Sequence, residues 1–187
     1  MKKIITLLAF TAVLGITGAN ANSGPGDGNG GNGSVTLNVK LNPIQTLTVN
    51  SNQKVVDLEY KTKDDYLKGV ASTQENHLTV FSTGGFNINV KSSSAQLTGS
   101  QDNIDASTIQ ITAANGTSTT LPSSGFETKA LGGSGETIVT SDVGGAELNF
   151  NVTYKGKGDN EYINKYYNSE SPTTVYTTTV MYEIVAK

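Results

Sequence analysis

The sequence predicts an all-β protein, an antiparallel β-sandwich of immunoglobulin-like type with about eight or nine strands. From residue 34 to the C-terminus, short segments in which apolar and polar residues alternate follow one another. These segments are rich in Val, Ile, Thr, Tyr and Phe, the residues that favour strands. Glycine-rich turn signals such as Thr83-Gly84-Gly85 and Gly144-Gly145 separate them. A closed barrel is the alternative all-β architecture.

Residues 1–21 have the layout of a secretory signal peptide. Lys2 and Lys3 form a basic start, residues 4–16 are largely apolar, and Ala19 and Ala21 are the small residues that a signal peptidase reads. The apolar stretch is shorter than the roughly 20 residues that a membrane-spanning helix needs. We therefore expect export to the periplasm, the cell surface or the extracellular space, and no transmembrane segment in the mature chain.

Residues 22–33, NSGPGDGNGGNG, are half glycine and contain no large apolar side chain. Such a segment buries too little surface to offset the entropy of ordering it, so we expect a flexible segment. Residues 34–187 are then expected to form a single sandwich domain.

The first predicted strand lies in SVTLNVKL, where Val35, Leu37, Val39 and Leu41 alternate with polar residues. Asn42-Pro43 then interrupts the pattern, and a second apolar segment follows. Two interpretations stay open. SVTLNVKL is either the first strand of its own domain or a strand lent to a neighbouring copy.

The other predicted strands are the segments 55–60, 77–82, 86–91, 107–113, 136–141, 147–155 and 174–186. The last of these is apolar on both faces, which predicts a strand inside a sheet rather than at its edge. The best helix candidate is the segment 64–71, which Gly69 weakens.

Charge and composition make several function classes improbable. All 13 basic residues are lysines, and loss of the signal peptide leaves 11 of them against 16 acidic residues, a net charge of −5. An acidic chain without arginine is a poor nucleic-acid binder. The chain has no cysteine, so stability must come from packing and strand pairing rather than from disulfides.

No residue pattern predicts catalysis, a metal site or a cofactor. His77 is the only histidine, and at the start of an apolar run it is expected to be structural. Transition-metal sites usually need several His or Cys ligands. Carboxylates that could run glycoside hydrolysis occur in pairs such as Asp64-Asp65, but in polar surroundings. We therefore expect a non-enzymatic protein, with a carboxylate-based hydrolase well behind.

The most distinctive loop, EYINKYYNSESP, carries Tyr162, Tyr166 and Tyr167. Tyrosines on a loop can form a surface that stacks on sugars or contacts a protein partner. They can equally hold a long loop against the domain, and we favour that interpretation.

The layout of SVTLNVKL, Asn42-Pro43-Ile44 and QTLTV resembles that of chaperone–usher pilins, in particular the colonisation-factor (alpha) class. The order of the later strands and the Thr/Val-rich last strand are similar too. In that family the N-terminal strand completes the incomplete sandwich of the next subunit. The resemblance implies that Val35, Leu37, Val39 and Leu41 are the donor positions.

We therefore expect a cell-surface or extracellular structural or adhesion protein of a Gram-negative bacterium, for example a fimbrial subunit that assembles by β-strand addition. The expected partners are other copies of the chain or other surface proteins. The alternative is a carbohydrate- or envelope-glycan-binding module that acts through the tyrosine loop.

Overall fold

The computed structural model describes residues 32–122, 125–164 and 166–187. The chain divides into two units, residues 1–39 and residues 40–187, and every strand among the described residues belongs to the second. The predicted signal peptide lies outside the described residues, as does the predicted glycine-rich segment apart from Asn32 and Gly33. In the described part of the chain, no helix is long and apolar enough to cross a membrane.

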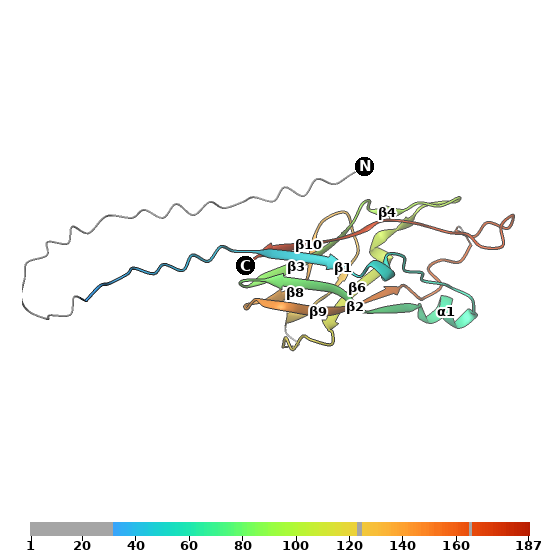
Figure 1. Ribbon diagram of the computed structural model, residues 1–187. Helices are drawn as coiled ribbons and strands as arrows, with labels where there is room; N and C mark the ends of the chain where they lie inside the picture. The colour runs from blue at the N-terminus through green and yellow to red at the C-terminus, as the bar shows by residue number, and fades with distance from the viewer. Residues whose placement is uncertain (1–31, 123–124, 165) are drawn as a thin grey trace, which may run out of the picture. The chain divides into compact units, whose positions relative to one another are not determined.

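Within the described residues, ten strands form antiparallel sheets, which confirms the predicted all-β class (Figure 1). The larger sheet has the order β1-β2-β9-β6-β7, with bounds Gln45–Val49, Ala71–Ser82, Gly145–Gly156, Ile109–Asn115 and Thr128–Ala130. The second sheet has the order β10-β3-β8, with bounds Val180–Ala186, Phe86–Ser92 and Glu136–Ser141. A short pair, β4 (Gln96–Leu97) and β5 (Ile104–Asp105), stands apart. The immunoglobulin-like type stays a prediction.

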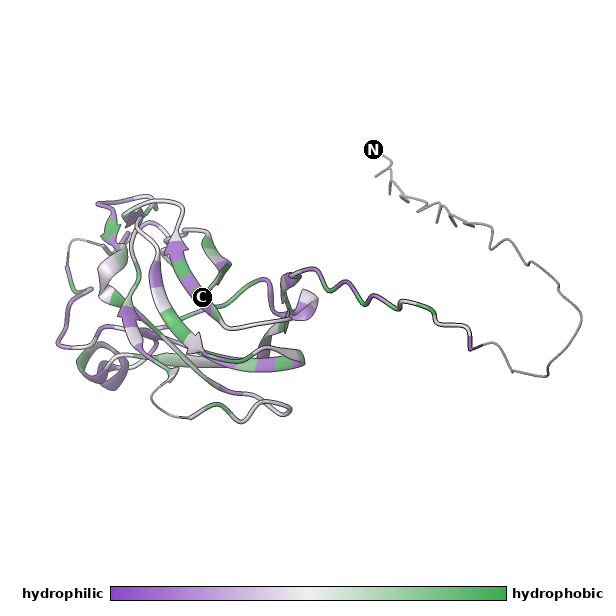
Figure 2. Ribbon diagram, turned by 90° about the vertical axis from the view of Figure 1, so that its left-hand side faces the viewer, coloured by the Kyte–Doolittle hydropathy of each residue, from purple (hydrophilic) through white to green (hydrophobic). Residues whose placement is uncertain are grey.

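The core lies between the two larger sheets. Phe86, Ile88 and Val90 of β3 and Phe150 and Val152 of β9 are buried, each separated from the next by a less buried residue. The rings of Phe86 and Phe150 meet edge to face, with centroids 6.3 Å apart. Hydrophobic and hydrophilic residues accordingly alternate along the strands (Figure 2).

Some predicted strands differ from the observed ones because alternation reports burial rather than pairing. Residues 55–60 alternate as predicted, with Val56 and Leu58 packed against the core, but they join no ladder. The strand predicted at residues 77–82 is the second half of β2, and the strand predicted at 174–186 begins only at Val180. The short strands β4, β5 and β7 were not predicted.

The helix candidate is a single short helix, α1 (Lys63–Lys68). Thr62 caps it, since its hydroxyl accepts from the Asp65 N–H while the Asp65 carboxylate accepts from the Thr62 N–H. Gly69 ends the helix at φ 80°, and a Cβ there would lie 2.3 Å from the Gly156 carbonyl oxygen. Two 3₁₀ turns complete the described elements, η1 (Ser51–Gln53) and η2 (Ala106–Thr108).

An irregularity in β2 brings the single histidine into the core. The pairing of β2 with β9 shifts between Gln74 and Leu78, and Asn76 has φ 48°. The Asn76 N–H is satisfied by the Asn151 side chain at 2.7 Å. Because the strand is offset at this point, His77 and Leu78 are both buried although they are adjacent in sequence.

His77 belongs to a buried chain of hydrogen bonds that joins the two sheets. Its Nε2 lies 2.8 Å from the Tyr154 hydroxyl of β9, which lies 2.6 Å from the Tyr182 hydroxyl of β10. Its Nδ1 lies 3.0 Å from Oε1 of Gln53 in η1. The Gln53 amide donates to the Glu75 carbonyl, so Oε1 is the acceptor and Nδ1 carries the proton. In the neutral ring, Nε2 then accepts from the Tyr154 hydroxyl.

Burial lowers the pKa of His77, because a charged imidazolium in the core loses its hydration. Burial likewise raises the pKa of the Tyr154 and Tyr182 hydroxyls. A histidine whose folded pKa is depressed stabilises the fold above its unfolded pKa of about 6.5. That contribution is lost as the pH falls through the folded pKa.

We predict that His77→Gln destabilises the fold by about 1–3 kcal/mol at pH 7, since Tyr154 and Gln53 lose well-placed partners. Urea unfolding between pH 7 and pH 5 measures the effect. The free energy of unfolding of the native chain should fall across this range, and that of H77Q should fall less. Parallel curves for the two proteins would show that His77 titrates alike in the folded and unfolded states.

Candidate functional site

The predicted donor segment forms no strand. Residues 32–44 are without secondary structure, and β1 begins only at Gln45. The side chains of Val35, Leu37, Val39 and Leu41 are 95%, 84%, 76% and 89% exposed. If this segment were extended, the four large apolar side chains would share one face of the strand. In the structure they are exposed rather than packed in a core.

The segment meets the sandwich at a fixed point. The Ile44 N–H donates to the Thr83 hydroxyl at 3.0 Å, and the Thr83 N–H donates to the Ile44 carbonyl at 3.0 Å. Pro43, directly before, has no N–H to extend the β1 ladder. We call this pair of hydrogen bonds the Ile44–Thr83 clamp.

Two sheet edges lie side by side where β1 and β10 meet (Figure 1). β1 is the last strand of the larger sheet and β10 the last strand of the smaller one. In the part of the chain that the structure describes, no backbone hydrogen bond joins them. We call this open side, made of residues 45–49 and 180–186, the β1–β10 seam.

The opposite side of the sandwich is closed by backbone pairing. Phe126 pairs with Val139 of β8, and the Glu127 N–H donates to the Ile138 carbonyl at 3.1 Å. The chain that leads into β7 thereby crosses from one sheet to the other. Within the described residues, the sandwich is therefore joined by backbone pairing along this side, whereas β1 and β10 lie against each other without such pairing along the other.

The apolar side chains that face inward along the seam are incompletely covered. Leu47 of β1 and Val180, Tyr182 and Ile184 of β10 pack against the core but are only partly buried. Side chains one strand further in, such as Ile88 and Val80, are fully buried. The seam is thus a row of apolar side chains between two unpaired backbone edges.

The position of β10 corrects the prediction that the last strand lies inside a sheet, because β10 is an edge strand. Its outward residues Met181 and Val185 are exposed, although the strand is apolar on both faces. Exposed apolar edge strands invite pairing with another chain, and natural proteins usually protect them with charges or a covering element. β10 therefore has the composition of an interior strand, but it pairs with a neighbouring strand on one side only.

The two strands of the seam run in opposite directions. The Gly85 carbonyl accepts from the Gln45 side chain at the start of β1 and from the Lys187 N–H just after β10. One end of the seam therefore holds the start of β1 and the end of β10. A strand inserted antiparallel to β10 would run parallel to β1.

The structure separates the three candidate tyrosines of the loop. Tyr162 is partly buried and donates to the Thr108 hydroxyl at 2.7 Å, and Tyr166 is 8% exposed. Their rings contact each other and extend a series of edge and tilted contacts that joins Tyr60, Tyr66, Tyr162, Tyr166 and Tyr176. Tyr167 is 64% exposed and is the one of the three that faces solvent.

Burial raises the pKa of Tyr60 and of Tyr162, so both phenols stay neutral at physiological pH. The Tyr60 hydroxyl donates to the Lys157 carbonyl at 2.8 Å and ties the cluster to the end of β9. Tyr60 and Tyr66 have no sequence signal as members, because they lie about a hundred residues before the loop, and Tyr176, just after the loop, was assigned to the last predicted strand. The cluster holds residues 160–176 against the sandwich.

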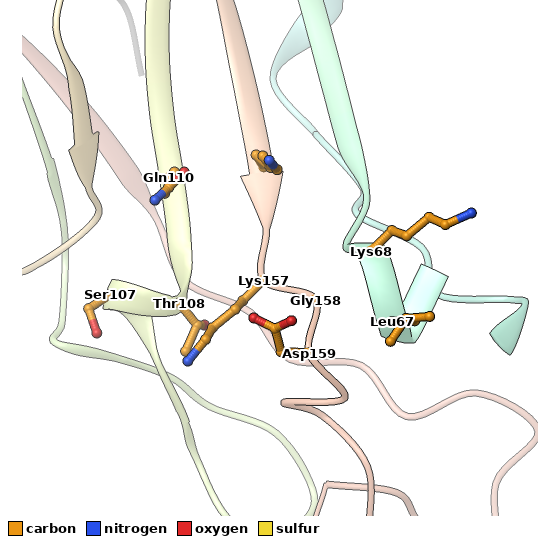
Figure 3. A pocket seen from close by; sticks show the side chains of 9 residues that line it. Leu67, Lys68, Ser107, Thr108, Gln110, Lys157, Gly158 and Asp159 are labelled. Carbon is orange, nitrogen blue, oxygen red and sulfur yellow. The ribbon is translucent and has the colours of Figure 1, made fainter. Parts of the chain in front are cut away.

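A shallow polar pocket lies beside this cluster (Figure 3). Three lysines line it, but Lys157 pairs with Glu161 at 2.7 Å and Lys68 pairs with Asp64 at 2.6 Å. The Lys68 side chain also points away from Lys157 and Asp159 in Figure 3. Two of the three positive charges are thus balanced within the chain. Within the described residues, no group of three or more His, Cys, Asp or Glu side chains is arranged to hold a metal ion.

We predict that Tyr166→Ala destabilises the fold by about 3 kcal/mol, since it removes a packed ring. Tyr167→Ala should change the free energy of unfolding by less than about 0.5 kcal/mol. Thermal unfolding of the two variants tests this contrast. Equal losses of stability would mean that the two rings are packed alike in solution.

Comparison with known proteins adds no family to these observations: no protein-family model and no curated protein matches the chain.

Proposed function

We propose that the protein is an exported, non-enzymatic structural subunit that assembles with other copies of itself by β-strand addition. Residues 34–41 of one copy insert into the β1–β10 seam of the next. The observation that carries the proposal is the coexistence in one chain of an exposed alternating segment and an open seam between two edge strands. Each supplies what the other lacks.

The chemistry of the two parts is complementary. An inserted strand offers a row of N–H and C=O groups to the unpaired edges of β1 and β10. Val35, Leu37, Val39 and Leu41 would point inward, onto the partly buried side chains of Leu47, Val180, Tyr182 and Ile184. Burying each such side chain stabilises by about 1.5–3 kcal/mol relative to leaving it exposed. Ser34, Thr36, Asn38 and Lys40 would face solvent.

The lengths agree as well. Eight extended residues, 34–41, span about 26 Å, and the seven residues of β10 span about 23 Å. The extended chain continues before β10, where Thr177 and Thr98 exchange backbone hydrogen bonds and the Ser93 N–H donates to the Thr179 carbonyl. An inserted segment of this length would cover the whole seam.

The short connection to β1 favours a second copy as the source of the strand. A segment antiparallel to β10 runs parallel to β1, and parallel neighbours need a crossover of about a dozen residues or more. Only residues 42–44 separate Leu41 from Gln45. The chain therefore cannot place its own segment in its own seam in this direction, whereas a neighbouring copy can.

The same arrangement is what the resemblance to chaperone–usher pilins implies, and a signal peptide at residues 1–21 would deliver the chain to the compartment where such subunits assemble. A cell-surface role in a Gram-negative bacterium is part of this proposal. The glycan-binding alternative rests on Tyr167 alone among the loop tyrosines, since Tyr162 and Tyr166 are packed.

We predict that the chain forms multimers by light scattering behind size exclusion, and that Leu37→Asp combined with Val39→Asp abolishes them. Charged side chains at these positions would have to be buried in the seam, at a cost that strand pairing cannot offset. The matched control is Thr36→Asp with Asn38→Asp, which adds the same charge to the solvent face and should leave the multimers intact.

A chain that begins at Gln45 should be a folded monomer, because none of the described residues before it, 32–44, belongs to a strand. If the native chain is itself monomeric at every concentration, strand addition is refuted. Retention on a polysaccharide column that Tyr167→Ala removes would then favour the glycan-binding alternative.

A further inference from the structure

The sandwich has two ends of different character. One end, which we call the tether end, gathers the Ile44–Thr83 clamp, the turn at residues 83–85, the turn at 142–144 and Lys187. The Gly85 carbonyl accepts from Lys187 N–H, and a Cβ at Gly144 would lie 2.1 Å from the Ser82 carbonyl oxygen. At this end Ile44 and Val143 are 52% and 62% exposed.

The other end, which we call the loop end, carries α1 and the loops of residues 54–60 and 157–176. The Asn160 and Asp159 N–H groups donate to the Tyr66 and Leu67 carbonyls, which fixes the later loop to α1. In Figure 1, α1 and the loop that precedes β10 lie at the end of the sandwich toward which β1 points. The tether end and the loop end are therefore opposite ends of the seam.

Large exposed apolar side chains gather at the loop end. Among the described residues, the exposed large apolar side chains at this end include Val55, Leu67, Ile163, Tyr167 and Val175. Val175 and Val55 lie closest in sequence to the seam, five residues before β10 and six residues after β1. A contiguous patch of exposed apolar side chains is typical of a surface that contacts another molecule.

Strand direction and tether length identify that molecule. A segment inserted antiparallel to β10 begins at the tether end of the acceptor and finishes, with Leu41, at the acceptor's loop end. Residues 42–44 of the donor follow, and three residues span at most about 10 Å. The donor's own tether end is held to this short connection by the clamp. It must lie directly against the loop end of the acceptor.

We propose that the loop end of one copy packs against the tether end of the next copy, with Val55, Val175 and Tyr167 on one side and Ile44 and Val143 on the other. This inference rests on the proposed function. It adds a second interface, distinct from the inserted strand, in which the partner is another copy of this chain and the contact is largely apolar.

The cysteine-free sequence allows a direct test by cross-linking of the full chain. Val143→Cys combined with Val175→Cys places one thiol at each end. A short bismaleimide should convert multimers of this variant into a covalent ladder that survives boiling in SDS. The matched control combines V143C with Ala114→Cys, since Ala114 is exposed on the outer face of β6, away from both ends.

A ladder from V143C/V175C and none from V143C/A114C supports the end-to-end contact. Multimers that give no ladder with V143C/V175C, or equal ladders with both pairs, overturn the contact and leave strand addition standing. A chain that forms no multimers overturns both, because the contact follows from the insertion.

Discussion

Hydrogen-bonding groups at the edge of a β-sheet need partners, and this constraint governs the architecture of the protein. The sandwich meets it on one side by the bridge between Phe126 and Val139. On the other side, β1 and β10 each have a partner on only one flank. The need of these two free edges for hydrogen-bonding partners explains, under the proposal, both the exposed segment before β1 and the partly buried side chains of the seam. The proposed contact between the loop end and the tether end follows from insertion of the segment into the seam.

Stability in the absence of cysteine comes from polar and aromatic groups that cross between elements. The His77–Tyr154–Tyr182 chain connects β2 and β9 of one sheet with β10 of the other, the strand that has a neighbour on one side only. At the loop end, the tyrosine cluster holds the described residues 160–164 and 166–176, none of which lies in a strand. Both devices reinforce the parts of the fold where sheet pairing is weakest.

Alternation in the sequence predicts much of the fold, because side chains that share one face of a strand must share one environment. It locates β3 and β8 closely, and it identifies the buried positions of residues 55–60 even though they form no ladder. It misses β4, β5 and β7, which are too short to show a period. Alternation also places the last strand inside a sheet, which is wrong. The residue pattern shows that both faces of the strand are apolar, but it does not show which strands lie beside it in the chain.

The candidate site follows the same division. The alternation of Val35 to Leu41 is visible in the sequence, but their exposure is not, since the same pattern predicts a strand with one buried face. The seam has no sequence signal, because it depends on which strands become edges. That depends on pairings between distant residues, such as Val180 with Ser92 and Ala186 with Phe86. For the same reason the sequence identifies the loop tyrosines of the cluster but not Tyr60, which contacts Tyr162 only in the folded chain.

The Ile44–Thr83 clamp determines how the domain would experience tension. A pull on the segment before Pro43 reaches the sandwich at Ile44, and it passes into the β2–β3 turn and along β1. The hydrogen bonds between β1 and β2 lie across that direction and would be loaded together, in shear, rather than one after another as in peeling. A chain of such subunits would carry load through its strands lengthwise, with the loops left largely free of it.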